Sequence, residues 1–193
     1  MTEQAFSLMP FPSPNVPDIN ISGWLSHENP VITLHYALTG SIDEIFIPPP
    51  SAHPQRKGEL WKATCFEFFL AIRDQLQYWE FNMSPSGDWN AYRMDAYRRI
   101  GFGEEASIQR LQFKVERETD RLTLDAEVDL SSIFRKFEHM EIGITAILQT
   151  KHGNETYWAL THPAPQPDFH LRESFILRLA AQTHPLGQSA PGD

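Results

Sequence analysis

The stretch that decides the fold runs from Leu60 to Arg99 and reads LWKATCFEFFLAIRDQLQYWEFNMSPSGDWNAYRMDAYRR. Apolar residues alternate with other residues along it, and this period of two is typical of half-buried β-strands. We predict three consecutive antiparallel strands, at residues 64–72, 77–84 and 88–95. Short turns join them at 73–75 and 85–87, because Pro and Gly favour the backbone angles that turns need.

The polar residues of this stretch have the opposite parity to the apolar ones. Glu67 lies between two phenylalanines, and Glu80 and Asn82 alternate with apolar residues in the second strand. If the two strands pair as a hairpin, the carboxylates and the amide gather on one face of the sheet. Trp89 and Tyr92 follow nearby. This composition is typical of a polar ligand cleft.

The remaining chain adds strands, loops and one short helix. Alternation predicts strands at residues 20–24, 31–39, 44–47, 110–116, 121–128, 141–149, 156–160 and 174–180. Residues 129–137 predict a short helix with Asp129 or Ser131 as its N-cap, and residues 97–107 predict a loop. About ten short strands at regular spacing indicate an all-β, jelly-roll-like antiparallel β-sandwich.

The chain has 193 residues, which is enough for one domain with a full core. We divide it into an N-terminal arm at 1–18, a β-sandwich domain at 19–181 and a disordered tail at 182–193. Phe6 and Leu8 of the arm are expected to pack on the domain. The tail is rich in Pro, Gly and Ser, a composition that does not form a core.

Charge and composition limit the partners. The net charge is −9 and the isoelectric point is about 5.3, and an acidic surface repels phosphate backbones, so no nucleic-acid partner is expected. A single cysteine excludes an intrachain disulfide and a cysteine-based metal site. The first residues, MTEQAFSLMPFPSP, do not read as a signal peptide, and no segment approaches the ~20 apolar residues of a membrane-spanning helix. We therefore expect a cytoplasmic protein without a membrane partner.

Two interpretations of Glu67, Glu80 and Asn82 stay open. In one, they hydrogen-bond a polyhydroxylated ligand, or their oxygens coordinate a hard cation such as Ca²⁺. In the other, Glu67 is a buried carboxylate paired with an arginine, because an unpaired buried charge is too costly to keep. The candidate partners are Arg93, Arg98 and Arg99. The two interpretations are compatible.

Trp61, Trp89 and Trp158 are candidates for stacking on the apolar face of a sugar, with core packing as the alternative for each. Trp79 shares its parity with its apolar neighbours, so we assign it to the core. Trp61 and Trp158 lie next to polar loops in the sequence, which favours a place at the site for both.

The loop sequence THPAPQPDFHLRES, which starts at Thr161, gathers several titratable residues. His162 and His170 lack the i, i+4 spacing of a His-Glu-x-x-His metal site, so we expect their imidazoles to bond backbone groups. Such a loop can close over a ligand. A haem held by Met and His would use Met94 rather than Met83, because Met83 has core parity.

Signatures of catalysis are weak. Ser84 and Ser86 do not form a Gly-x-Ser-x-Gly elbow, and Cys65 lies in an apolar strand, where a thiol is inert. Glu67 and Glu80 could be the two carboxylates of a glycosidase, although neighbouring strands bring many carboxylates together by chance.

Three segments, LWKATCFEFFLAI, YWEFNMSPSGDWNAYRMDAYR and YWALTHPAPQPDFHLRESF, carry a family resemblance. In this order, between Leu60 and Leu179, they resemble the bacterial DOMON-like proteins, relatives of the family 9 carbohydrate-binding modules. The FN-x-SP-x-G and PDFH-x-R-x-SF patterns are specific when they occur together. The resemblance implies a jelly-roll-like sandwich whose concave face holds sugar or haem.

In the sugar-binding relatives, paired aromatic rings clamp the sugar and acidic and amide groups hold its hydroxyls. By position, the resemblance implies Trp61 and Trp158 as the rings, with Glu67, Asn82 and Arg98 as polar contacts. The full set of candidate ligand-binding residues is Trp61, Glu67, Glu80, Asn82, Trp89, Arg98, Trp158 and His170. We predict a small-molecule-binding module for a carbohydrate or sugar-like ligand. A haem-binding or redox domain and a glycan-active enzyme are the alternatives, and exposed edge strands would allow a homodimer.

Overall fold

The computed structural model describes residues 3–134 and 139–179, with the backbone alone at 100–102. These residues form twelve β-strands and three 3-10 turns. The strands are β1 (Gln4–Pro10), β2 (Ile19–Glu28), β3 (Val31–Gly40), β4 (Cys65–Ile72), β5 (Tyr78–Met83), β6 (Trp89–Ala96), β7 (Arg99–Glu104), β8 (Gln112–Arg117), β9 (Arg121–Asp129), β10 (Met140–Gln149), β11 (Glu155–Ala159) and β12 (Leu177–Leu179). The 3-10 turns are η1 (Ile42–Glu44), η2 (Leu60–Lys62) and η3 (Arg172–Ser174).

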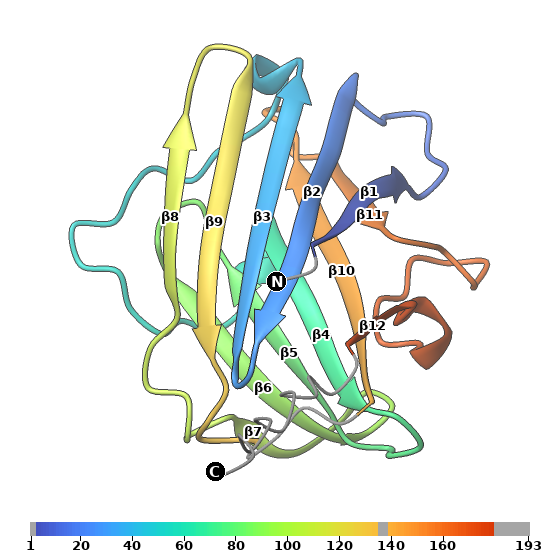
Figure 1. Cartoon of the computed structure of the whole chain (residues 1–193). Helices are drawn as coiled ribbons and strands as arrows, with labels where there is room; N and C mark the ends of the chain where they lie inside the picture. The colour runs from blue at the N-terminus through green and yellow to red at the C-terminus, as the bar shows by residue number, and fades with distance from the viewer. Residues whose placement is uncertain (1–2, 135–138, 180–193) are drawn as a thin grey trace, which may run out of the picture.

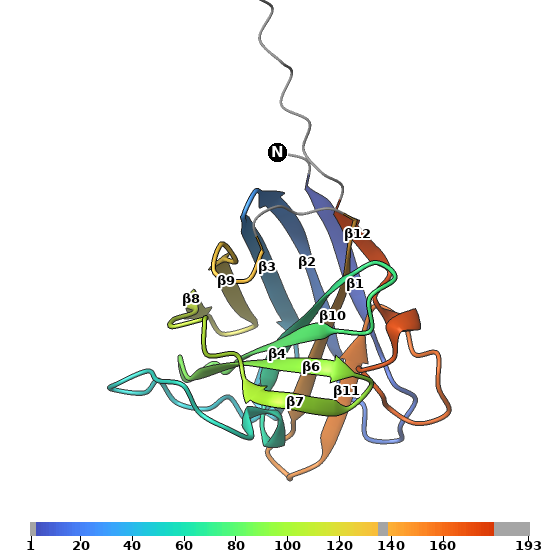
Figure 2. The ribbon, with the colours of Figure 1, turned by 90° about the horizontal axis from the view of Figure 1, so that it is seen from below.

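The strands form two antiparallel layers that face each other (Figure 1 and Figure 2). One layer has the order β1–β2–β3–β9–β8, and the other has β7–β6–β5–β4–β10–β11, with β12 also paired to β10. β1 belongs to both layers, because residues 4–8 pair with β2 whereas Met9 and Pro10 pair with β11. This arrangement confirms the predicted all-β, jelly-roll-like antiparallel sandwich.

Apolar side chains that alternate along the strands fill the space between the layers. On β4 and β5 they are the predicted core residues Phe66, Phe68, Leu70, Trp79, Phe81 and Met83. Phe68 and Phe81 are cross-strand partners whose ring centroids lie 4.3 Å apart in a stacked arrangement. Burial of each such side chain stabilises the fold by about 1.5–3 kcal/mol.

The opposite parity of the second layer faces outward, and this face carries the polar residues. Glu67 pairs with Asn82 across β4 and β5, and Phe69 pairs with Glu80. The predicted hairpin and its common polar face are therefore confirmed. Residues 161–176, named here the cover segment, lie against the same face, where Phe169 and Phe175 pack with apolar residues of β4 to β6.

Two segments that the sequence did not mark as strands are strands in the structure. Part of the predicted N-terminal arm forms β1, because Phe6 and Leu8 alternate into the core and are 7% and 3% exposed. The predicted loop at 97–107 contains β7, which corrects that prediction. β7 escaped detection because its pairing with β6 includes two register shifts, which disturb the alternation of side chains.

The predicted short helix at 129–137 lies partly at 135–138, outside the described residues. Its described part is a turn in which the amides of Ile133 and Phe134 both donate to the Leu130 carbonyl. Asp129 accepts a hydrogen bond from the Ser131 amide at 2.8 Å, as a capping residue does. Across residues 3–134 and 139–179, no helix has the length and apolar character needed to cross a membrane.

Other strand boundaries also differ from the predictions. The segment at 44–47 forms only a single bridge between Ile45 and Thr150, since the polyproline stretch that follows cannot supply ladder donors. The last strand begins at Leu177 rather than at Ser174, because η3 precedes it. The tail at 182–193 lies outside the described residues.

Candidate functional site

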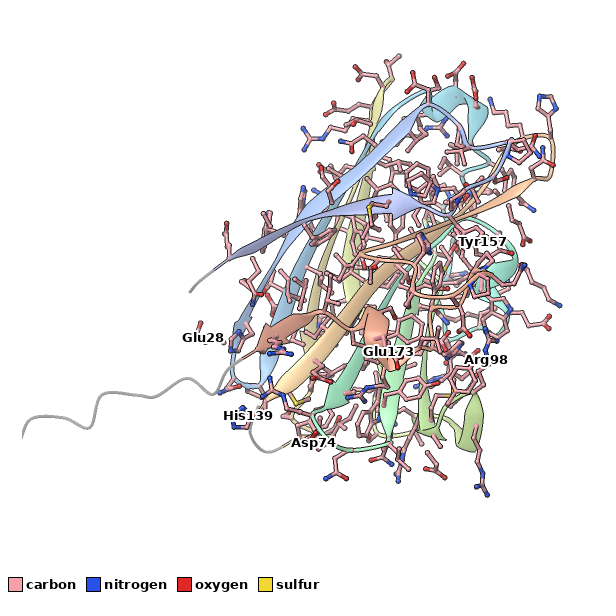
Figure 3. The ribbon with its side chains drawn as sticks, turned by 90° about the vertical axis from the view of Figure 1, so that its right-hand side faces the viewer. Glu28, Asp74, Arg98, His139, Tyr157 and Glu173 are labelled. Carbon is pink, nitrogen blue, oxygen red and sulfur yellow. The ribbon has the colours of Figure 1, made fainter. Side chains whose placement is uncertain are left out.

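A cleft of about 350 Å³ lies between the outer face of the second layer and the cover segment. Its size falls within the range of small-molecule sites in proteins. The residues that line it are Trp61, Glu67, Phe69, Glu80, Met94, Arg98, Ile147, Tyr157, Pro167, Phe169 and His170. Figure 3 shows two of them, Arg98 and Tyr157, on the same side of the molecule.

Three polar side chains form the floor, and all are buried. Glu67, Glu80 and Asn82 are 2%, 6% and 0% exposed. The Asn82 amide donates to Glu80 Oε1 at 2.8 Å, and the Thr145 hydroxyl donates to Glu67 Oε2 at 3.3 Å. Within the described residues, Glu67 Oε1 and Asn82 Oδ1 have no hydrogen-bond partner.

Burial disfavours the charged form of both carboxylates. Burial, and next the charge of Glu80, raise the pKa of Glu67 well above its usual value. Burial raises the pKa of Glu80 to about 7, although the hydrogen bond from Asn82 and the charge of Arg98 oppose that rise. The floor therefore holds protons at a pH where an exposed glutamate is ionised.

The predicted pairing of Glu67 with an arginine is absent from the described part of the chain. Arg98 pairs instead with Asp168, with 3.0 Å between Nη2 and Oδ1, and Arg93 lies 3.9 Å from Asp95. Arg93 stands on the other parity of β6 and so faces away from the floor. The cost of burying Glu67 is met by protonation rather than by an ion pair.

Aromatic rings wall the cleft above this floor. Trp61 lies on η2, where the buried Leu60 anchors the turn and leaves the indole 37% exposed. Its ring meets that of Tyr92 edge-on, with centroids 5.8 Å apart. Across the cleft, the rings of Tyr157 and Phe169 meet at 6.1 Å. Polar floor and aromatic walls together suit a ligand with both hydroxyl groups and apolar faces.

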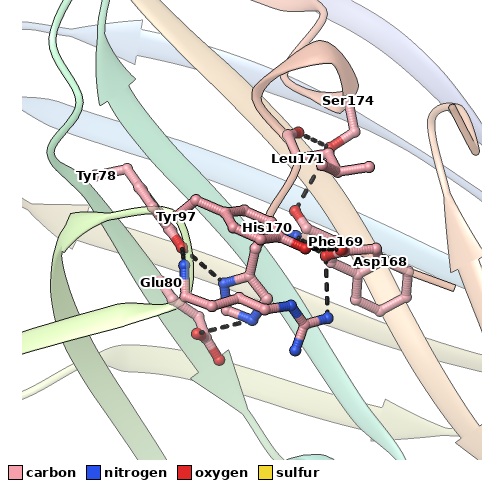
Figure 4. Close-up of polar contacts among 9 residues, drawn as sticks. Tyr78, Glu80, Tyr97, Asp168, Phe169, His170, Leu171 and Ser174 are labelled. Atoms are coloured by element: carbon pink, nitrogen blue, oxygen red, sulfur yellow. Dashed lines mark hydrogen bonds and ion pairs between the residues drawn. The ribbon is translucent and has the colours of Figure 1, made fainter. Parts of the chain in front are cut away.

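Asp168 joins the cover segment to the turn between β6 and β7 (Figure 4). Its carboxylate accepts hydrogen bonds from the Tyr97 hydroxyl, from Arg98 and from the backbone amide of His170, the last at 3.0 Å. Burial opposes ionisation of Asp168, but these hydrogen bonds and the charge of Arg98 hold its pKa below the usual value. Asp168 is therefore ionised at neutral pH.

His170 is neutral at neutral pH. Burial, and next the charge of Arg98, lower its pKa to about 4. The Tyr78 hydroxyl accepts from the Arg98 amide at 3.1 Å and lies 2.9 Å from His170 Nδ1, to which it can donate. With Nδ1 as acceptor, the proton of the ring is on Nε2, which lies 4.0 Å from Glu80 Oε2.

The structure brings most of the predicted site residues together. Trp61, Glu67, Glu80, Arg98 and His170 line the cleft, and Asn82 lies beneath it, bonded to Glu80.

Trp89 and Trp158 are not in the cleft, which corrects their expected placement. Trp89 is 6% exposed on the core side of β6, with the Arg56 guanidinium 4.5 Å above its ring. Trp158 is 2% exposed in the core, and its indole donates to Thr156 at 3.0 Å. Both have the parity that points between the layers, and a nearby polar loop does not change that parity.

Sequence reasoning missed Tyr157 and Phe169 as wall residues. Tyr157 was detectable, because it has the parity opposite to its core neighbour Trp158. Phe169 lies in a loop without periodicity, so only the fold of the cover segment reveals its position.

Of the candidate metal and haem ligands, Met94 and His170 line the cleft, whereas His162 and Met83 lie elsewhere. His162 Nε2 lies 2.8 Å from the Met9 carbonyl, as expected for an imidazole that bonds backbone, whereas His170 bonds Tyr78. Met94 lines the cleft, and Met83 packs in the core. In the described ranges, no group of three or more His, Cys, Asp or Glu side chains could hold a metal ion.

A larger hollow of about 1260 Å³ lies between β8 and residues 54–56. One of its charged lining residues is Arg56, whose guanidinium donates to Asn90 and to backbone carbonyls that include those of Ala91 and Glu105. The buried polar groups here are therefore satisfied within the protein. The smaller cleft, with its unpartnered oxygens, is the candidate site.

Comparison with known proteins gives information on the fold. No protein-family model matches the chain, and no curated protein matches its sequence. Among solved structures, a proposed carbohydrate-binding protein from Bacteroides uniformis is similar with a TM-score of 0.60 and 13% identity, over 89% of this chain and 84% of that chain.

Two structures of a family 9 carbohydrate-binding module from Caldicellulosiruptor kristjanssonii are also similar. The complex with cellotriose has a TM-score of 0.47 and 12% identity, over 79% of this chain and 70% of that chain. The complex with glucose has a TM-score of 0.45 and 13% identity, over 75% and 69%. At such identities the likeness is one of fold alone.

Proposed function

We propose that the protein is a non-catalytic binding module whose cleft holds a carbohydrate or sugar-like ligand. The observation that carries the proposal is the unpartnered oxygen of Glu67 at the floor, beside the unpartnered Asn82 Oδ1. A buried acceptor without a partner costs about 1–3 kcal/mol. A sugar hydroxyl would hydrogen-bond the Glu67 carboxyl, accepting from it when it is protonated and donating to it when it is ionised, and so remove that cost on binding.

The walls support the same ligand class. Trp61 and Tyr157 offer ring faces and edges for the C–H face of a pyranose, and the floor offers acceptors for its hydroxyls. The description of the Bacteroides uniformis protein as carbohydrate-binding agrees with this proposal. A closer relation to the DOMON-like proteins is part of the proposal, since the two specific sequence patterns include Asn82 and the Asp168–His170 segment of the cleft.

The two alternatives fit the cleft less well. A haem would need a free imidazole nitrogen, but His170 Nδ1 lies against Tyr78 and Nε2 faces Glu80. A glycosidase needs carboxylates on both sides of one bond, whereas Glu67 and Glu80 are neighbours on a single sheet face. The cleft therefore favours binding without chemistry.

The first test is Trp61→Ala, with Trp24→Ala as the matched control. Trp24 is a partly exposed tryptophan on the outer face of the other layer, where it stacks on His35. We expect isothermal titration with mono- and oligosaccharides to show about tenfold weaker binding for Trp61→Ala, because a stacking face is lost. Trp24→Ala should bind as the unmodified protein does.

A panel of neutral, amino and acidic sugars without any binding would reject the proposed function. Equal affinity in Trp61→Ala and Trp24→Ala, with binding intact, would place the sugar elsewhere on the protein.

A further inference from the structure

The two acidic side chains of the floor lie next to each other on the sheet. Glu67 is opposite Asn82, and Glu80 is opposite Phe69, two residue pairs further along β4 and β5. On one face of an antiparallel pair, such diagonal positions are within reach of long side chains. The contribution of Glu80 to the raised pKa of Glu67 reflects this proximity.

The cationic side chain at the described cleft already has a carboxylate partner. Arg98 bonds Asp168, and its exposed side chain lies at the rim rather than at the floor. His170 is neutral, because burial lowers its pKa to about 4. The charge of Arg98 acts on Glu80 from the rim, but within the described residues no arginine or lysine forms an ion pair with Glu67 or Glu80, and protons balance their charge instead.

The hydrogen-bonding pattern of the floor also favours a ligand that brings donors. Glu67 Oε1 and Asn82 Oδ1 are unpartnered oxygens, and both are acceptors once Glu67 is ionised. The Asn82 amide is already bonded to Glu80. A ligand that fills the floor must therefore bring donors, and an ammonium group brings three donors and a charge.

The walls also suit a cation. The exposed indole of Trp61 and the ring of Tyr157 line the same cleft. A cation within about 6 Å of such a ring face is attracted by the negative face of the aromatic ring.

We infer that the cleft selects an amino sugar over the neutral parent sugar, with the ligand's ammonium group held by Glu67 and Glu80. This inference rests on the proposed sugar-binding function of the cleft. The ammonium replaces the protons of the acidic pair, so binding releases protons to the solvent.

Several titratable groups lie on the elements that surround the pair. They are Cys65 on β4, Tyr78 on β5, Tyr92 on β6, Arg98 in the β6–β7 turn, and Asp168 and His170 on the cover segment. Of these, only Arg98 is a cation at neutral pH. Between pH 5.5 and 7 the change in charge among these groups is therefore centred on Glu80, whose pKa is about 7.

The experiment uses three matched pairs: glucose with glucosamine, galactose with galactosamine, and mannose with mannosamine. Isothermal titration at pH 7 should show at least one amino sugar binding about tenfold or more tightly than its neutral parent. At pH 5.5 the same amino sugar should bind about tenfold more weakly, because Glu80 is then protonated. Titration in buffers of different ionisation enthalpy should show proton release.

The variant is Glu67→Gln/Glu80→Gln, which keeps the side-chain shape and removes the charge. Its ratio of amino-sugar to neutral-sugar affinity should fall to about one, whereas the control Glu116→Gln on β8 should keep the preference. Thermal melting shows whether the double variant folds, and Glu80→Gln alone is the second variant if it does not.

The outcomes separate the two claims. Equal binding within every pair, or preference for the neutral sugar, overturns the amine inference and leaves the sugar-binding function standing. Absence of binding by all six sugars overturns both. An amino-sugar preference that persists in the charge-free variant also overturns the inference, because the preference would then arise elsewhere.

Discussion

At the level of single residues, burial favours the uncharged form of both Glu80 and His170. It therefore shifts their pKa values in opposite directions, because one side chain is an acid and the other is a base. The pKa of Glu80 rises to about 7 and that of His170 falls to about 4. The first shift makes the folded state bind more protons than the unfolded chain, and the second makes it bind fewer. The two therefore give the free energy of unfolding opposite slopes with pH.

The pH window follows from the values. The contribution of Glu80 to the free energy of unfolding is lost as pH rises from 4.5, its usual pKa, to about 7, its pKa in the folded state. For His170, stability is lost as pH falls from 6.5, its usual pKa, to about 4. Glu67 acts in the same direction as Glu80, because burial raises its pKa too. Between about 4.5 and 6.5 the contributions oppose one another.

Glu80→Gln removes one of these opposing contributions. Relative to the unmodified protein, the free energy of unfolding of the ligand-free variant should increase as pH rises from 4.5 to 7.5, by up to about 3 kcal/mol. Urea unfolding at several pH values measures this. Glu116→Gln, which changes an exposed side chain, should give a curve parallel to that of the unmodified protein. A parallel curve for Glu80→Gln would show that Glu80 is ionised in the folded state at low pH.

The cover segment is the element that completes the cleft, and besides the contact of His162 with the Met9 carbonyl it is held at two further places. At one end, Asp168 holds the turn after β6 through Tyr97 and Arg98. At the other end, Arg172 donates to Glu141 at 2.8 Å, and the Phe175 ring lies directly over Gly143. A Cβ added at Gly143 would lie 2.9 Å from that ring, so the glycine gives Phe175 its place on the sheet.

Asp168→Asn tests the first of these ties. Asn keeps an acceptor oxygen but loses the charge that strengthens the hydrogen bonds from Tyr97 and Arg98. We expect faster amide hydrogen exchange across residues 161–176, about three- to tenfold weaker sugar binding, and a loss of about 1 kcal/mol in the free energy of unfolding.

The control for this tie is Glu59→Gln, which removes the charge of an ion pair with Lys62 whose side chains are both 63% exposed. It should leave hydrogen exchange in the cover segment unchanged, since an exposed pair of this kind contributes little. Equal exchange rates in Asp168→Asn and Glu59→Gln would mean that the packing of Phe169 and Phe175 alone holds the segment.

Sequence patterns predicted the strands only where the alternation of apolar and polar residues is regular. β4, β5 and the hairpin of β8 and β9 follow from it, and so does the common face of Glu67 and Glu80. β7 does not, because of its two register shifts. The bond from Tyr97 to Asp168 joins residues 71 positions apart. No local pattern encodes such a contact, because it depends on how the loops pack after the sheets have formed.

At the scale of the whole molecule, one sheet separates the core from the cleft. The second layer buries one face against β2, β3 and β9 and carries the candidate site on the other. Alternation in the sequence predicted the two faces of each strand but not the position of Trp158, whose neighbour Tyr157 lies on the cleft side. The register of β11 with β10 places Trp158 opposite Ala146 and Tyr157 opposite Ile147, and this pairing determines which of the two rings enters the core.

This separation predicts that stability and binding can be changed independently. Trp158→Ala should lower the free energy of unfolding by about 3–5 kcal/mol, because it leaves a cavity in the core, yet sugar affinity should stay within about threefold. Trp61→Ala should do the reverse, with less than about 1 kcal/mol lost in stability and about tenfold lost in affinity. Urea unfolding and isothermal titration of the same samples measure both quantities. If Trp158→Ala is too unstable to study, Trp158→Phe gives a smaller loss with the same expected selectivity. Lost binding with unchanged stability in a Trp158 variant would mean that the ligand enters between the layers rather than on the outer face.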